Sequence, residues 1–160
     1  MDIRPLDPAD LPAVLDLTVA TFGPFYEDSY RPAVGDKVFH NRHHSWRDDY
    51  RKHLAGVHDP AHGRHAAVAT SGGSILGYVA WVVQAEARHG EIDILAVASS
   101  SRRQQCGRRL AEHAIDAMRA DGVEVVSIGT GGDSFHAPAR ALYESLGFTP
   151  FPNVIYTKAV

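Results

Sequence analysis

Charged residues gather at a point in the sequence where an apolar strand gives way to a helix. Residues 91–97 read as a buried strand, residues 98–105 as a polar turn, and an amphipathic helix follows. The first backbone N–H groups of a helix have no partner within it, and the helix dipole adds partial positive charge there. Four arginines surround this junction, namely Arg102, Arg103, Arg108 and Arg109. The chemistry that this arrangement favours is the binding of a phosphate group.

Periodic apolar residues predict the elements that hold this junction in place. Leu110, Ala114, Ile115 and Met118 fall on one face of a helix expected over residues 106–121, which ends at Gly122. Residues 64–70 and 75–83 alternate as two strands of a hairpin, and residues 123–128 read as a further strand. We therefore expect the phosphate-binding junction to lie at the edge of a buried sheet.

The two ends of the chain complete the predicted sheet. Residues 1–5 read as a first short strand, and a helix with Leu11, Val14, Leu15 and Phe22 on one face follows it. Residues 151–158 are predicted to form the last strand and to close the sheet. Between residues 23 and 63 the pattern is irregular, and only one helix is expected there, near residues 46–54.

Two motifs in this order resemble one known family. After Leu95-Ala96-Val97 the turn reads Arg102-Arg103-Gln104-Gln105-Cys106-Gly107, and residues 139–148 read Ala-Arg-Ala-Leu-Tyr-Glu-Ser-Leu-Gly-Phe. Both segments are similar to motifs of the GNAT superfamily of acyl-CoA-dependent N-acetyltransferases. The chain departs from the first motif at Gln105, where the family has a glycine that lets the backbone approach the CoA pyrophosphate. The Gln105 side chain either narrows that approach or points outward.

The resemblance implies a fold and a division of the chain. We expect an α/β (α+β) fold with a GNAT-like mixed, mostly antiparallel twisted sheet flanked by helices, formed by residues 1–160 as a single domain. In this reading residues 91–122 are the acetyl-CoA-binding strand, loop and helix. Residues 22–63 correspond to the part of the family that lines the acceptor pocket and varies most between members.

The resemblance also assigns acetyl-CoA as the co-substrate and implies residues that hold it. The amides of Leu95 and Val97 correspond to groups that contact the thioester carbonyl and the pantetheine arm. His136 stands where many members have an asparagine that contacts the cofactor. The remaining expected contacts surround the pyrophosphate, namely Arg102, Arg103, Gln104, Gln105, Cys106, Gly107 and Arg108.

Acetyl transfer to an amine requires that the ammonium form lose a proton. A lysine-type amine is only about 0.04% neutral at pH 7, so deprotonation accounts for roughly 4–5 kcal/mol of the barrier. Glu91 matches the general-base glutamate of one branch of the family, and Asp93 projects from the same strand face. Either acid is a candidate base, and either could instead hold the substrate's ammonium. Tyr143 falls on the family's general-acid tyrosine, which donates a proton to the departing thiolate.

The predicted function is N-acetyl transfer from acetyl-CoA to a primary amine of a small molecule, by direct transfer in a ternary complex. Aromatic and acidic residues of the variable region are expected to enclose the acceptor, namely Phe25, Tyr26, Glu27, Asp28 and Trp46. A protein or peptide amine is the alternative within the class. A catalytically silent CoA-binding module is the alternative outside it, and Gln105 is the reason to consider it.

Composition argues against several other classes of protein. The net charge of −3 argues against a nucleic-acid binder. One cysteine, no long apolar run and no leader-like start predict a soluble, cytoplasmic protein without membrane contact. Ten histidines occur without a zinc-type spacing, so no metal is expected. Resembling proteins are often dimers, which leaves a homodimer open.

Two other interpretations are weaker. Cys106 would begin the predicted helix, where a thiol's pKa falls, but the matching family position packs beneath the loop, so covalent catalysis is not expected. The glycine-rich segment 129–132 lacks the third spaced glycine and the long helix of a dinucleotide fold, and we do not read it as a nucleotide loop.

Overall fold

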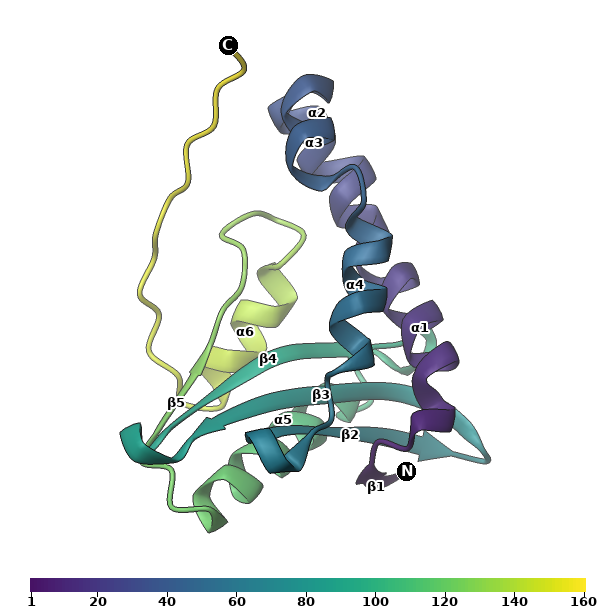
Figure 1. The fold of residues 1–160 in the computed structure, drawn as a ribbon, viewed down its shortest axis with the longest axis vertical. Coiled ribbons are helices and arrows are strands. Elements are labelled where there is room, and N and C mark those ends of the chain that lie inside the picture. The colour runs from purple at the N-terminus through teal and green to yellow at the C-terminus, as the bar shows by residue number, and fades with distance from the viewer.

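Five strands form one sheet in the order in which they occur along the chain (Figure 1). They are β1 (Asp2–Pro5), β2 (Arg64–Ser71), β3 (Ser74–Gln84), β4 (His89–Val97) and β5 (Val125–Ile128). The computed structural model describes all residues, 1–160. Strands β1 to β4 pair in an antiparallel manner, whereas β5 runs parallel to β4. The predicted mixed, mostly antiparallel sheet flanked by helices is confirmed.

Helices cover both faces of the sheet. On one face lie α1 (Leu11–Pro24) and α4 (Trp46–Ala55), and on the other lies α5 (Cys106–Ala120) (Figure 1). Leu110, Ala114 and Met118 of α5 are fully buried against the strands, as their spacing predicted. The buried hydroxyls of Thr18 and Tyr78 lie 2.7 Å apart and fasten α1 to β3. Two apolar cores therefore enclose the central strands β2 and β3.

The region expected to be irregular is almost continuously helical. A π-helical turn (Phe25–Tyr30) follows α1 directly, and α2 (Arg31–Val34) and α3 (Asp36–His43) precede α4. Aromatic and charged side chains alternate here without an apolar stripe, so periodicity could not reveal these turns. The helix predicted near residues 46–54 is confirmed as α4.

Strand β4 contains a bulge at Asp93. Ala80 pairs with Ile94 while its neighbour Trp81 pairs with Ile92, so Asp93 has no residue opposite it on β3. Asp93 and Ile94 are consecutive, yet both lie on the face that α4 covers. A bulge has this effect because the extra residue interrupts the alternation of side chains.

Strands β4 and β5 separate after a short parallel ladder. The last pair in their register is Ile92 with Ile128, so residues 93–97 of β4 have no partner on that side (Figure 1). Backbone groups at the free edge of a strand remain available to a ligand. The separation therefore opens the sheet beside the bulge.

The C-terminal segment corrects one prediction. Helix α6 (Ala137–Ser145) ends as expected at Gly147, whose φ of 90° is left-handed. Residues 151–158 do not close the sheet, because residues 149–160 form no strand and extend away from the body (Figure 1). Pro152 lies within the predicted strand, where it fixes φ and lacks an N–H for a sheet ladder. None of the helices combines the length and apolar character that a membrane-spanning segment requires.

Candidate active site

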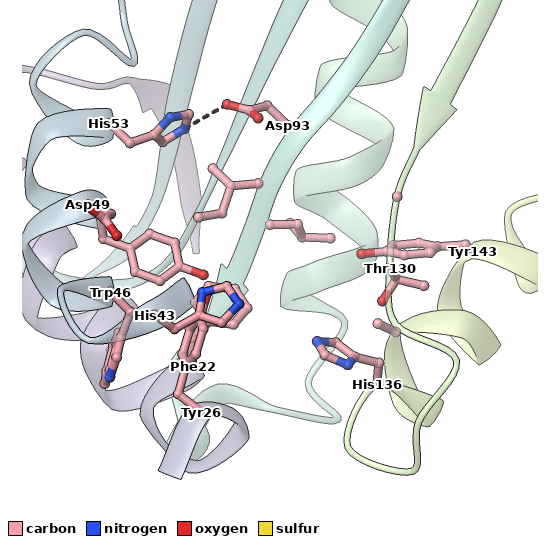
Figure 2. A pocket seen from close by; sticks show the side chains of 15 residues that line it. Phe22, Tyr26, His43, Trp46, Asp49, His53, Asp93, Thr130, His136 and Tyr143 are labelled. Carbon is pink, nitrogen blue, oxygen red and sulfur yellow. Dashed lines mark ion pairs between the residues drawn. The ribbon is translucent and has the colours of Figure 1, made fainter. Parts of the chain in front are cut away.

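A cavity of about 470 Å³ lies between the helical layer and the open side of the sheet (Figure 2). Residues of α1 and α4 form one wall, and β4, the segment after β5 and helix α6 form the other. Its volume is in the range of small-molecule sites. The cavity therefore sits where the sheet opens beside the β4 bulge.

The helical wall is a cluster of aromatic rings. Tyr26 stacks on Trp46 at 4.8 Å between ring centres, and Phe22 stacks on Tyr50 at 5.5 Å. The π-helical turn after α1 carries Tyr26 into this cluster. The side chain of Trp46 is fixed further, because its indole Nε1 donates to a carboxylate oxygen of Glu27 at 3.1 Å. These packed rings form a rigid, largely apolar wall.

The five residues predicted to enclose the acceptor differ in their position relative to the cavity. Tyr26 and Trp46 line the cavity, while Phe25 lies beside it with its ring 4.7 Å from that of His136. Glu27 is not part of the lining, and the hydrogen bond from Trp46 is the main reason that its pKa is lowered. Asp28 is exposed and also lies outside the lining. The carboxylate that the helical wall does present to the cavity is Asp49.

His53 and Asp93 form the polar end of the cavity. His53 Nε2 lies 2.7 Å from Asp93 Oδ2, and each side chain is 31% exposed (Figure 2). The hydrogen bond from His53 is the largest cause of the lowered pKa of Asp93. The bulge in β4 turns Asp93 toward α4, which carries His53. A hydrogen-bonded imidazole and carboxylate can accept a proton and stabilise the resulting charge.

The two predicted acids of β4 therefore have different surroundings. Asp93 lines the cavity, whereas Glu91 is exposed, lies outside the lining and forms no ion pair. His53 was not singled out from the sequence. Its signal is the spacing of Trp46, Asp49, Tyr50 and His53, which places all four on one face of α4.

Tyr143 stands on the wall opposite α4. Its hydroxyl points from α6 into the cavity (Figure 2), and its ring packs edge-on against Phe148 at 6.2 Å. Burial raises the pKa of Tyr143 to about 12. The phenol is therefore protonated at neutral pH and is able to donate a proton.

The start of α5 offers free amides near the open edge of β4. The Arg109 amide makes the first turn of the helix by donating to Gln105 O at 2.9 Å, and Gln105 supplies no side-chain cap. The amides of Cys106, Gly107 and Arg108 are thus left without an intrahelical partner. Free amides at a helix start are a geometry that favours a phosphate group.

The residue that replaces the motif glycine adopts a glycine-like backbone. Gln105 has φ 63° and Arg103 has φ 58°, both in the left-handed region that costs most side chains free energy. A Cβ at Gly107 would lie 3.4 Å from Leu142 Cδ2 and 3.5 Å from Val97 Cγ2, which is ordinary contact. The turn thus keeps a left-handed bend without the first glycine.

The other predicted cofactor residues lie around this turn or in the cavity. Leu95 lines the cavity, and His136 does so with Nδ1 2.7 Å from Asp133 Oδ2. Arg108 donates to Ser145 Oγ at 2.8 Å, which links α5 to α6. Gln104 Nε2 donates to Ser100 O at 2.8 Å, and Arg102 is exposed.

Cys106 is a packing residue in this structure. Its side chain is 2% exposed, and burial raises the pKa of its thiol. A buried, protonated thiol is a poor nucleophile. No group of three His, Cys, Asp or Glu side chains is arranged to hold a metal ion.

Comparisons with known proteins give consistent matches. Residues 15–148 match the model of the Acetyltransferase (GNAT) family. The chain is 41% identical over 70 residues to mycothiol acetyltransferase of Beutenbergia cavernae, an alignment that covers 44% of this chain and 23% of the relative. Across three curated relatives the alignments cover 23%, 42% and 52% of the relative's length.

Two solved structures illustrate the similarity of the fold. The ribosomal-protein-S18-alanine N-acetyltransferase of Escherichia coli matches with a TM-score of 0.65 and 25% identity, covering 94% of this chain and 79% of that one. The enzyme AAC(6')-Iy, in complex with the bisubstrate analog CoA-S-monomethyl-acetylneamine, matches with a TM-score of 0.70 and 14% identity. That alignment covers 99% of this chain and 97% of the other, and at this identity it shows the fold alone.

Proposed function

This chain belongs to the Acetyltransferase (GNAT) family, and we propose that it moves an acetyl group from acetyl-CoA to a primary amine of a small molecule. Both substrates would be bound together, so that transfer is direct. The observation that carries this proposal is the placement of the His53–Asp93 pair and Tyr143 on opposite walls of one cavity. A proton acceptor and a proton donor are what the two ends of this reaction require.

The residues around the start of α5 fit the diphosphate of acetyl-CoA. The amides of residues 106–108 have no intrahelical partner, and the exposed arginines Arg102 and Arg103 add positive charge. From this point the free edge of residues 93–97 leads toward the cavity. We assign the amides of Leu95 and Val97 to the thioester carbonyl and the pantetheine arm. The bound co-substrate would supply the activated acetyl group.

His53 and Asp93 are assigned to the incoming amine. His53 accepts the proton that the ammonium loses, directly or through a water, while Asp93 holds the imidazole and stabilises its charged form. Glu91 is the less favoured candidate, because it lies outside the cavity lining. At the other end of the reaction Tyr143 donates its phenolic proton to the departing thiolate.

The acceptor is proposed to be a small, partly apolar amine. The aromatic wall suits an apolar body, and Asp49 places a carboxylate among these rings for a cation. A cavity of about 470 Å³ encloses a small molecule better than a folded protein surface. A peptide amine and a silent CoA-binding module are the alternatives that the experiment must separate.

Calorimetry with acetyl-CoA and a thiol-release assay over amines and peptides test the proposal. We expect acetyl-CoA to bind, and small primary amines to be acetylated faster than peptides. A preference for peptides would show that the acceptor is a peptide amine and not a small molecule. Tight binding of acetyl-CoA without turnover on any acceptor would favour the silent CoA-binding module. No binding of acetyl-CoA would overturn the proposal entirely.

A further inference from the structure

Aromatic contacts join the two walls of the cavity at the end away from the His53–Asp93 pair. The ring of Phe25, in the π-helical turn, lies 4.7 Å from that of His136 and 5.7 Å from that of Phe135. Phe135 and His136 belong to the segment between β5 and α6. Figure 2 shows His136 at this end of the cavity and the His53–Asp93 pair at the other. The walls therefore meet at both ends.

Phe25 fills the space behind two lining residues. Tyr26 and His136 line the cavity from opposite walls, whereas Phe25 is not part of the lining. The ring of Phe25 contacts both of them, at 5.2 Å from the ring of Tyr26 and 4.7 Å from that of His136. Phe25 is only partly buried, so its outer side faces solvent. One ring thus closes the gap between the walls and separates this end of the cavity from solvent.

Both partners in this contact are braced by their own wall. Tyr30 packs on Phe25 with 5.8 Å between ring centres. On the other wall, the backbone amide of His136 donates to Asp133 Oδ1 at 3.2 Å, and its Nδ1 lies 2.7 Å from Asp133 Oδ2. Arg140 holds the same loop by donating to the Asp133 carbonyl at 2.7 Å. Because several contacts fix each ring, the pair resists displacement by a bound molecule.

We propose that Phe25 is an end stop that limits the length of the acceptor. The inference rests on the proposed function, in which the acceptor's amine lies beside His53 and Asp93. The rest of the acceptor then extends along the aromatic wall toward His136, where the ring of Phe25 blocks further extension. A longer acceptor would have to displace a packed aromatic pair, so the cavity selects amines with a short apolar body.

A series of phenylalkylamines, from benzylamine to phenylhexylamine, tests the end stop in three chains. They are the natural chain, Phe25→Ala, which opens the gap, and Phe25→Met, the matched control that fills most of it. While the amine fits, each added methylene should raise kcat/KM by about 4-fold. We expect kcat/KM of the natural chain and of the control to fall by about 10-fold at the first amine that is too long. Phe25→Ala should accept that amine and still acetylate benzylamine at the natural rate.

The length limit of the three chains decides the inference. An equal limit in the natural chain and in Phe25→Ala, or no limit in the natural chain, would overturn the end stop. Loss of benzylamine turnover in Phe25→Ala would also overturn it, because the ring would then support the whole site. Phe25 belongs to neither apolar core, so the fold should persist, as circular dichroism will check. Phe25→Val, a milder truncation, replaces Phe25→Ala if helix is lost.

Calorimetry with the same amines separates this inference from the proposed function. If the natural chain acetylates none of them, the proposed function fails for these acceptors, and affinity alone judges the end stop. The natural chain should then bind amines up to a limiting length, and Phe25→Ala should bind longer ones. A natural chain that binds no amine of the series would overturn the end stop as well.

Discussion

The imidazole Nε2 of His53 lies 2.7 Å from a carboxylate oxygen of Asp93, which joins helix α4 to the bulge of strand β4. This contact connects two elements that are distant in sequence and sets the polar end of an otherwise aromatic cavity. It is the arrangement on which the proposed removal of the amine's proton depends.

Removing the imidazole should slow the chemical step. We expect His53→Gln to lower kcat by about 100-fold at pH 7, since general-base catalysis contributes on this scale. The control is His62→Gln, which changes an exposed histidine outside the cavity. The deficit should shrink at high pH, where the free amine itself is more abundant. A deficit that is equal at pH 7 and pH 10 would indicate a structural role for His53.

Tyr143→Phe should separate chemistry from binding. The variant keeps the ring that packs against Phe148 but loses the proton donor, so kcat should fall by about 10-fold or more while acetyl-CoA affinity is preserved. Because burial raises the pKa of Tyr143 to about 12, loss of its proton should not limit the rate below about pH 10. Stopped-flow assays and calorimetry measure the two quantities. An unchanged kcat would withdraw the assignment.

Asp49→Asn should weaken the binding of cationic acceptors. The carboxylate lines the cavity, and a partly exposed ion pair contributes up to about 1 kcal/mol, so KM should rise by up to about 5-fold with little change in kcat. The matched control is Asp48→Asn, which alters the neighbouring carboxylate outside the lining. Equal effects of the two substitutions on KM would point to the net charge of α4 instead of a contact in the cavity.

Gln105→Gly should stabilise the turn before α5. Gln105 has φ 63°, a conformation that costs a non-glycine residue about 1 kcal/mol and costs glycine little. Part of the gain is lost through the greater entropy of the unfolded chain, so we expect a rise of up to about 1 kcal/mol in the free energy of unfolding. Gln104→Gly is the control, because residue 104 does not have a positive φ. Urea denaturation measures the free energy of unfolding of both variants. A larger increase for Gln104→Gly than for Gln105→Gly would refute backbone strain at Gln105.

The lowered pKa of Asp93 predicts a stability difference that depends on pH. A carboxylate whose pKa is lower in the folded state stabilises the fold above its unfolded pKa of about 3.9, and this contribution is lost as pH falls through the folded value. Asp93→Asn should therefore be less stable than the natural chain at pH 7 by roughly 0.5–1 kcal/mol after solvent screening. Once the pH has fallen below the folded pKa of Asp93, the stabilities of the two should converge. A difference of constant size in urea melts across this range would contradict the linkage.

The sheet and helix α5 could be predicted because each is recorded in a local pattern. The alternation in β3 and the spacing of Leu110, Ala114 and Met118 reflect burial on a sheet face and on a helix face. The π-helical turn could not be predicted, because Phe25 and Tyr30 pack on each other and Tyr26 lines the cavity, so that none of them marks a buried core face. The course of residues 149–160 was missed because β-propensity describes a residue's preference and not which sheet it joins.

The candidate site likewise contains residues that local sequence motifs predict and residues that only the packing of the fold reveals. Tyr143 and the turn before α5 were predicted from motifs, and the structure places the former in the cavity and the latter at a helix start with free amides. The partnership of His53 with Asp93 depends on the packing of α4 on β4 and on the bulge, neither of which leaves a mark in a short stretch of sequence. The roles of these residues, the cytoplasmic location and the acceptor stay predictions.

The bulge at Asp93 makes a single position serve two purposes. Deleting that residue would remove the carboxylate but would leave a regular ladder, because Ile92 and Ile94 already pair with consecutive residues of β3 and face opposite sides of the sheet. The sheet can therefore lose this one position and keep its pairing, whereas the cavity would lose its carboxylate at the polar end. In a randomised library of this strand, variants that lack residue 93 should keep the fold of the sheet but lose activity.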